Sequence, residues 1–279
     1  MKIIGCSNSK KLAERVANTL KIEYSHLEIR NAHNGEMHIK FNTSINNETI
    51  LLFQSLYPHP NHSLLELLFA AETAKDLKAK KIILVLPYFA FLTEEYRLEH
   101  GECVGSKVIS SILNKTADEI ITIDPHQDLS KLFTIPIHAI STAPLIKKYI
   151  EKNFISPYIL IAPDENAKNM LNNTSLDFLT LNKKRIDEYN VKISDSIELE
   201  NKDAILIDDM INTGTTMSQA IKSLKSKHNV YCITVHPVLA GNAEKLLEKT
   251  KIISTNTITH HTNQIDVAPL LVDYIKEKL

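Results

Sequence analysis

The sequence has few cysteines, and they are widely separated. Cys6, Cys103 and Cys232 are the only three in the 279-residue chain. An odd number at such spacings does not fit the disulfide framework of a small secreted protein. No two of them have the spacing of a zinc-binding pair. We therefore expect free thiols in a reducing compartment.

Long apolar segments and an excess of one charge are also absent. No run of 18 apolar residues could form a transmembrane helix, and the amino terminus turns polar after Cys6, too early for the apolar part of a signal peptide. Lys and Arg number 32 against 33 Asp and Glu, so no surface for nucleic acid or an anionic membrane is expected. These features favour a cytoplasmic protein with neither nucleic-acid nor membrane partners.

What the chain does contain is an alternation of strand-like and helix-like segments. Its 43% hydrophobic and 23% charged residues are typical of a globular protein. Strands are predicted at 2–6, 49–54, 81–87, 119–124, 158–162, 176–181, 204–209 and 230–236. A helix is predicted over 64–78, with Ser63 and Glu66 as a capping box. This alternation predicts an α/β fold with parallel sheets flanked by helices.

Eight strand units exceed the needs of one small sheet, so two tandem α/β domains are expected. We place them at residues 1–140 and 141–265, because the fourth unit ends near Ser141. No low-complexity linker marks the boundary. A final helix over 266–279 could pack on either domain, and the first is our assignment.

The stretch AILIDDMINTGTTM, residues 204–217, carries the strongest chemical signal. An apolar strand ends in Asp208 and Asp209, and a loop rich in Thr and Gly then opens a helix. Backbone N–H groups and hydroxyls in such a loop can bind an anion, which the helix dipole also favours. Two acids beside it suit sugar hydroxyls or a divalent cation. The alternative is an ordinary loop with exposed acids.

Three further groups of polar residues follow predicted strands. His126 comes after 119–124, and Asp164 comes after 158–162. Lys183, Lys184 and Arg185 follow 176–181 and form a run of three cations. Such a run can stabilise charge on a transferred phosphoryl or pyrophosphoryl group. The alternatives are a structural histidine and a solvated cationic turn.

In combination these motifs resemble the ribose-phosphate pyrophosphokinase family over nearly the whole chain, and the archaeal-type members most. LIDDMINTGTTM is similar to the family's ribose-5-phosphate loop, NGEMHIKF to its flag hairpin, and DPHQ and PD to its metal-site segments. Lys183 and Arg185 match its catalytic Lys-x-Arg. The segments VLPYFAF, VHPVLAGNAEKLL and STNTITHHTNQIDVAPLL also follow family patterns in the same order.

The resemblance implies two phosphoribosyltransferase-like domains and transfer of pyrophosphate from ATP to ribose 5-phosphate, with Mg²⁺ as cofactor and a homodimer or larger homo-oligomer. It assigns Lys183 and Arg185 to catalysis; Asp208, Asp209, Asn212, Thr213, Gly214, Thr215 and Thr216 to ribose 5-phosphate; Asn34, Glu36, Thr93 and Glu94 to the nucleotide; and His126 and Asp164 to the metal.

The nucleotide side departs from the family pattern. Ala32 stands where the family has an aromatic residue that stacks on adenine, and Thr93 and Glu94 stand where it has Arg and Gln. In the ribose-phosphate loop an Asp becomes Asn212 and a Gly becomes Thr215. Two hypotheses follow: a pyrophosphokinase with a divergent ATP site, or a non-catalytic relative that binds ribose phosphate or nucleotide and regulates a partner.

Overall fold

The structure is a computed structural model. It describes residues 1–94, 96–97, 99–181, 183–185, 191–193, 197–199, 202–225 and 229–278, with the backbone alone at 183–185, 191–193, 197–198 and 225. Contacts divide the chain into two compact units. Unit 1 comprises Met1–Ile140, Thr257–Thr259 and Ala268–Leu279, and unit 2 comprises Ser141–Asn256 and His260–Val267. Among the described residues, no helix is long and apolar enough to cross a membrane.

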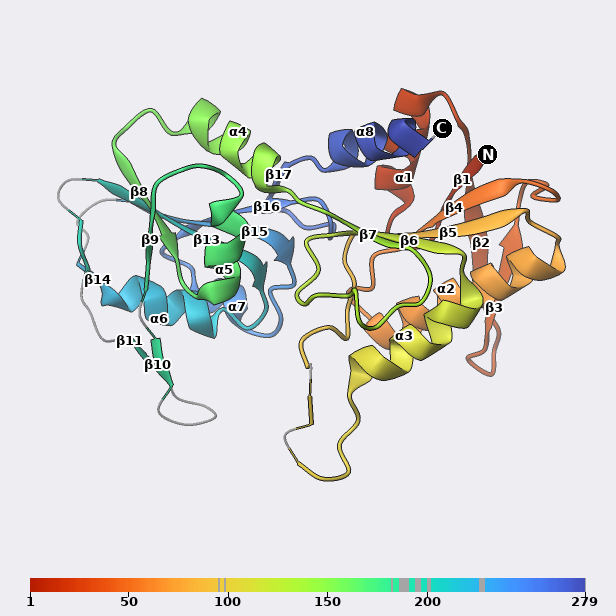
Figure 1. The fold of residues 1–279 in the computed structure, drawn as a ribbon, viewed down its shortest axis with the longest axis horizontal. Coiled ribbons are helices and arrows are strands. Elements are labelled where there is room, and N and C mark those ends of the chain that lie inside the picture. Colours follow the sequence, from red (N-terminus) through yellow and green to blue (C-terminus); the bar gives the residue numbers. More distant parts are fainter. Residues whose placement is uncertain are drawn as a thin grey trace. The chain divides into compact units, whose positions relative to one another are not determined.

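Unit 1 is a seven-stranded sheet in the order β3-β2-β1-β4-β5-β6-β7. All its strand pairs are parallel except β2 with β3. Its strands are β1 (Lys2–Gly5), β2 (Glu23–Asn31), β3 (Met37–Phe41), β4 (Thr49–Phe53), β5 (Lys81–Leu86), β6 (Glu119–Ile123) and β7 (Ile137–Ile140), and its helices are α1 (Lys10–Leu20), α2 (Pro60–Asp76), α3 (Gly105–Thr116) and α8 (Ala268–Lys278). Helices α2 and α3 cover one face, and α1 and α8 cover the other (Figure 1).

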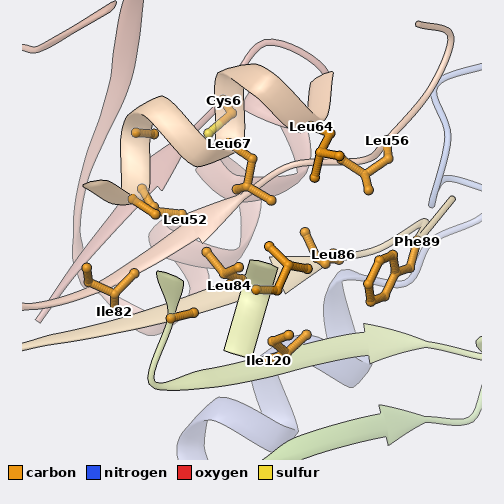
Figure 2. Packing of buried hydrophobic residues seen from close by; sticks show 14 of the residues in the cluster. Cys6, Leu52, Leu56, Leu64, Leu67, Ile82, Leu84, Leu86, Phe89 and Ile120 are labelled. Carbon is orange, nitrogen blue, oxygen red and sulfur yellow. The ribbon is translucent and has the colours of Figure 1, made fainter. Parts of the chain in front are cut away.

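The central strands of unit 1 are apolar because helices cover both of their faces. Residues 50–53 of β4 and 82–86 of β5 are all buried. Figure 2 shows Leu52, Leu84 and Leu86 of these strands packed beneath Leu67 of α2. This core holds the carboxyl ends of the strands at one edge, where loops can carry functional residues.

Unit 2 is a six-stranded parallel sheet in the order β17-β16-β15-β13-β8-β9. Its strands are β8 (Tyr158–Ala162), β9 (Phe178–Thr180), β13 (Asp203–Ile211), β15 (Val230–Pro237), β16 (Lys251–Thr255) and β17 (Asn263–Ile265), and its helices are α4 (Ala143–Asn153), α5 (Glu165–Asn172), α6 (Thr215–Ser223) and α7 (Ala243–Leu246). Helices α4 and α6 lie on opposite sides of this sheet (Figure 1). Two small ladders pair β10 (Lys183–Arg185) with β11 (Val191–Ile193), and β12 (Ile197–Glu198) with β14 (Leu224–Lys225).

The predicted capping box is wrong. Helix α2 begins at Pro60, and proline suits the first helical position because its missing N–H needs no partner there. Ser63 therefore lies inside the helix, where its hydroxyl donates to the His59 carbonyl at 2.9 Å. Glu66 is fully buried and accepts hydrogen bonds from the Ser7 N–H and hydroxyl instead of from the start of its own helix.

Candidate functional site

The paired carboxylates lie on a strand that is longer than the sequence pattern predicted. Strand β13 continues to Ile211, so Asp208 and Asp209 lie within it, and Asp208 pairs with Thr234 of β15. The two aspartates are only 5% and 9% exposed. Buried carboxylates need hydrogen-bond donors, and the Asp208 Oδ1 accepts the Asp209 N–H at 3.0 Å. The acids are therefore fixed parts of the sheet rather than exposed loop residues.

The loop after β13 presents hydroxyl groups to solvent. Asn212, Thr213 and Thr215 are exposed, and the Thr213 and Thr215 hydroxyl oxygens lie 3.0 Å apart. Gly214 precedes the first residue of α6 with a φ of +76°, a conformation that side chains with a Cβ disfavour. A Cβ at Gly214 would also lie 3.4 Å from Ala243 and Leu247. Glycine is therefore the residue that this turn requires.

The loop is held from the side by the segment that follows β15. The Leu239 N–H donates to the Ile211 carbonyl at 2.8 Å, and the Ala240 N–H donates to the Asn212 carbonyl at 2.9 Å. With two carbonyls bound in this way and Gly214 packed on α7, the loop has a defined conformation. Its hydroxyls and the first N–H groups of α6 are then preorganised for an anion.

Asp164 lies at the same edge of the unit 2 sheet as Asp208 and Asp209. Strands β8 and β13 are neighbours, with Ile161 opposite Leu206, so Asp164 and Asp209 each lie three positions beyond this pair. The chain continues from β8 to β9 on one side and from β13 to β15 on the other. Ligands in open α/β sheets bind in the crevice where the connections diverge in this way. Asp164 also caps α5, because its side chain accepts the Ala167 N–H at 3.1 Å.

The predicted cationic loop contains a short strand. Residues 183–185 form β10, which pairs antiparallel with β11. β10 follows β9, and β9 pairs with β8, the strand that precedes Asp164. The side chains of Lys183 and Arg185 lie outside the described residues, so the structure gives their place in the chain but no contacts.

Unit 1 brings His126 near Thr93 and Glu94. His126 follows β6, Thr93 and Glu94 follow β5, and these two strands are neighbours. The Gln127 side chain donates to the Leu92 carbonyl at 3.1 Å and so joins the two loops. Thr93 and Glu94 are exposed, whereas His126 is half-buried. His126 and Asp164, the two predicted metal ligands, belong to different units.

Asn34 and Glu36 lie in the exposed turn between β2 and β3. The Glu36 N–H donates to the Asn34 Oδ1 at 3.1 Å, and Gly35 has a φ of +85°. Residues 27–31 of β2 pair with β3 beyond the end of β1, so the hairpin extends past the edge of the sheet. Strands β1 and β4 separate it from β5. Within one copy of the chain, this turn is therefore not adjacent to Thr93 and Glu94.

A polar cluster in unit 1, in which Gln54, Ser55 and Glu66 are buried, was not predicted. The Glu66 carboxylate accepts the Ser7 N–H at 2.7 Å and the Ser7 hydroxyl at 2.5 Å. Asn8 donates its N–H to the Gln54 side chain at 3.0 Å and its amide to the Ser55 carbonyl at 3.0 Å. These residues follow β1 and β4, where the connections of this sheet diverge. The sequence signal was the polar pair Gln54-Ser55 directly after a buried strand.

The buried cysteines do not supply reactive thiolates. Burial raises the pKa of the Cys232 thiol to about 12, with a smaller contribution from the charge of Asp208. Burial also raises the pKa of Cys6 well above its ordinary value, and Glu66 adds to the shift. Both groups remain protonated near neutral pH, so their side chains serve packing.

Comparisons with known proteins cover nearly the whole chain. Residues 1–116 match the family model of the N-terminal domain of ribose phosphate pyrophosphokinase, and residues 130–274 match that of the phosphoribosyl transferase domain. The ribose-phosphate pyrophosphokinase of Methanothermobacter thermautotrophicus is 33% identical over 290 residues, covering 99% of this chain and 100% of the relative. That of Sulfolobus acidocaldarius is 31% identical over 281 residues, covering 96% of each. Both organisms are archaea.

A solved structure agrees with the fold. The crystal structure of phosphoribosylpyrophosphate synthetase from Mycobacterium smegmatis superposes with a TM-score of 0.85 at 24% identity, covering 99% of this chain and 98% of the other. The α/β architecture with two parallel-dominated sheets is therefore confirmed.

Proposed function

The chain belongs to the ribose-phosphate pyrophosphokinase family, and we propose that it transfers the β,γ-pyrophosphoryl group of ATP to ribose 5-phosphate. In this reaction the anomeric hydroxyl oxygen forms a bond to the β-phosphorus, the bond from that phosphorus to the α,β-bridging oxygen breaks, and AMP leaves. The hydroxyl proton passes to solvent. The observation that carries the proposal is the arrangement of Asp208 and Asp209 beside the preorganised loop 212–216 at the divergence point of the unit 2 sheet.

Ribose 5-phosphate fits the chemistry of this site. The phosphate would bind the hydroxyls of Thr213, Thr215 and Thr216, together with the N–H groups that open α6. Asp208 and Asp209 would accept hydrogen bonds from the ribose hydroxyls. These hydroxyls are neutral, so the two carboxylates would not repel them. The loop and the acids thus bind opposite ends of one small molecule.

The reaction also needs positive charge at the transferred group. We assign this role to Lys183 and Arg185, because charge spreads over the phosphoryl oxygens in the transition state and fixed cations stabilise it. β10 follows the strand beside β8, so its backbone begins near the same edge as Asp164. Along the chain, these cations therefore come directly after the strand that pairs with β8.

We assign Mg²⁺ as the cofactor and regard Asp164 and His126 as two candidate protein ligands, each argued within its own unit. Mg²⁺ is commonly held by one or two carboxylates together with substrate phosphates, and Asp164 can supply such a carboxylate beside the proposed sugar site. An imidazole is a softer ligand than this ion prefers, so we expect Asp164 to contribute more than His126. When bound, the ion would neutralise the phosphate oxygens of ATP.

The nucleotide would contact Thr93 and Glu94, and also Asn34 and Glu36. Because two strands separate the β2–β3 turn from β5 within one copy, we propose that the two pairs are joined in a homo-oligomer in which one copy's hairpin completes the site of another. We also propose a cytoplasmic location, which the three free cysteines support.

Loss of one loop hydroxyl is expected to weaken sugar-phosphate binding. Thr213→Val keeps the shape of the side chain but removes a hydrogen bond to the phosphate, and such charge-assisted bonds contribute roughly 1.5–3 kcal/mol. Isothermal titration calorimetry should show ribose 5-phosphate binding about tenfold weaker or more. The control Thr19→Val, at an exposed position of α1, should bind as the wild type. If Thr213→Val binds ribose 5-phosphate as tightly as the wild type, the loop is not part of the binding site.

Exposed apolar side chains on α2 and α3 support the homo-oligomer. Leu65, Phe69, Val108 and Ile112 are 38–47% exposed and lie one helical turn apart on two helices that pack together. We propose that these four side chains form one apolar patch at the interface between copies, because exposed apolar patches commonly mark protein–protein interfaces.

We expect Phe69→Glu to weaken self-association at least tenfold, because it places a charge in that patch. Light scattering after size-exclusion chromatography would measure the molar mass over a range of concentrations. The control Ile155→Glu replaces an apolar residue outside these helices that is 96% exposed, and it should leave the mass unchanged. A wild-type monomer at all concentrations would contradict the proposed assembly.

One set of residues favours a second candidate function. Ala32, Thr93 and Glu94 offer neither a ring for adenine nor a cation for phosphate. A non-catalytic relative that binds ribose phosphate and regulates a partner would tolerate this pattern. Formation of AMP by the purified chain would separate the two candidates.

A further inference from the structure

Three side chains in unit 2 converge at a place that the proposed reaction does not use. We propose that Glu244, His260 and His261 bind one divalent transition-metal ion, of which Zn²⁺ is the representative. Glu244 lies on α7, and the two histidines follow β16. The proposal is independent of the pyrophosphokinase reaction, because none of the three residues belongs to the assigned substrate site.

The ligand atoms are already close to metal-binding positions. The His261 Nε2 lies 3.0 Å from the Glu244 Oε2, and the His260 Nε2 lies 3.5 Å from the Glu244 Oε1. One ligand atom from each of the three residues lies within 4.8 Å of the others. Zinc–nitrogen and zinc–oxygen bonds of about 2.0–2.2 Å at tetrahedral angles place ligand atoms about 3.3 Å apart. Small side-chain rotations would therefore complete three protein ligands around one ion.

Buried residues around His260 orient its ring. The His260 Nδ1 lies 2.9 Å from the Thr262 Oγ1, which in turn lies 2.7 Å from the Ser254 Oγ. Ser254 is fully buried, and it also accepts a hydrogen bond from the Asn263 amide at 2.9 Å. Metal ligation through Nε2 requires the proton on Nδ1, where it would donate to Thr262. In the other tautomer, the same nitrogen would accept the Thr262 N–H at the longer distance of 3.3 Å. Metal binding would therefore select the tautomer in which Nδ1 carries the proton and donates to the Thr262 hydroxyl.

The ligand types define the class of metal. Imidazole nitrogens with one carboxylate suit Zn²⁺, Co²⁺, Ni²⁺ and Cu²⁺, whereas Mg²⁺ and Ca²⁺ prefer oxygen ligands alone. A histidine whose second nitrogen is hydrogen-bonded, as in His260, is the usual arrangement around such ions. Three protein ligands leave a further position for water. We therefore expect a transition-metal site from which excess Mg²⁺ does not displace the bound ion.

The site would crosslink two segments of unit 2. His260 begins the segment 260–267 of this unit, and Glu244 adjoins Ala243, which packs against Gly214. An ion that binds only the folded form stabilises it by mass action. Zn²⁺ should therefore raise the thermal midpoint of the full-length protein, and it should do so only while the three ligands are present.

The test uses the tag-free full-length protein, stripped of metal by chelator and held in excess MgCl₂. ZnCl₂ titration by calorimetry and CoCl₂ titration by visible absorption should reveal one site per chain. His261→Ala and Glu244→Gln should each weaken Zn²⁺ binding by more than the roughly 10- to 100-fold that loss of an outer-shell partner costs. Thr262→Val should fall within that range. The control His62→Ala removes an exposed histidine on α2 and should bind as the wild type.

The variants remain informative because their folding can be checked separately. The His261 side chain is 69% exposed, so its replacement should leave the metal-free circular dichroism spectrum and thermal midpoint unchanged. Loss of the cobalt absorption in folded His261→Ala and Glu244→Gln supports the site. Zinc affinity equal to wild type in both variants, or no zinc binding by the folded wild type, overturns it.

Discussion

Replacing Lys183 with alanine should lower kcat about 100- to 1,000-fold while KM for ribose 5-phosphate changes little. Removal of a single charge-stabilising group commonly costs this much in rate, because its interaction is strongest in the transition state. Steady-state formation of AMP from ATP and ribose 5-phosphate would measure both constants.

The neighbouring residue provides the control for this experiment. Lys184→Ala removes the same charge from the adjacent position of β10, which is the variable position of the Lys-x-Arg pattern that this segment resembles. We expect its kcat to remain within a few-fold of the wild type. A native kcat in Lys183→Ala would make this segment a solvated turn without a catalytic role. Equal loss of activity in both variants would leave the run of cations with only a general electrostatic role.

The second large effect concerns ATP, which the wild-type protein should bind weakly. Ala32 offers no ring, and stacking of a base on an aromatic side chain is typically worth about 1–3 kcal/mol. Thr93 cannot make a charge-assisted hydrogen bond to phosphate, a contact worth roughly 1.5–3 kcal/mol. Together these losses predict an affinity lower by at least about two orders of magnitude than that of a site containing both groups, since each 1.4 kcal/mol is about tenfold. Glu94, which is exposed beside Thr93, adds repulsion.

The double variant Ala32→Phe with Thr93→Arg should recover part of this affinity. Calorimetry with a non-hydrolysable ATP analogue and Mg²⁺ would compare it with the wild type, and ribose 5-phosphate affinity should be the same in both. Tight, micromolar nucleotide binding by the unmodified protein would contradict the prediction. It would mean that other residues have rebuilt the nucleotide pocket.

The parts of the fold that the sequence predicted are those governed by local pattern. The buried central strands read as apolar runs, and the 204–209 strand and the helix after it are present as β13 and α6. The strand was predicted over 204–209, with both acids at its end, and in the structure it extends over Asp203–Ile211. The two added residues at its carboxyl end, Met210 and Ile211, pair with β15, and local pattern does not show this long-range pairing.

Long-range pairing accounts for what local pattern missed. The resemblance to the family identified the hairpin at 34–41. Its separation from β5 depends on the order of strands in the sheet, which neither the hairpin sequence nor the β5 sequence determines. Likewise, Glu66 read as a capping residue, whereas its partner Ser7 is distant in sequence. The Glu244, His260 and His261 cluster combines α7 with the segment after β16, and no local pattern in the sequence connects these two segments.

The most direct test of the account is product analysis with the purified full-length chain. The protein would be incubated with Mg²⁺, ribose 5-phosphate and ATP well above its measured dissociation constant, and nucleotides and sugar phosphates would be quantified by anion-exchange chromatography. We predict AMP and phosphoribosyl pyrophosphate in equal amounts, with neither formed when ribose 5-phosphate is omitted. Binding of ribose 5-phosphate without formation of either product would contradict the pyrophosphokinase proposal and favour the non-catalytic relative.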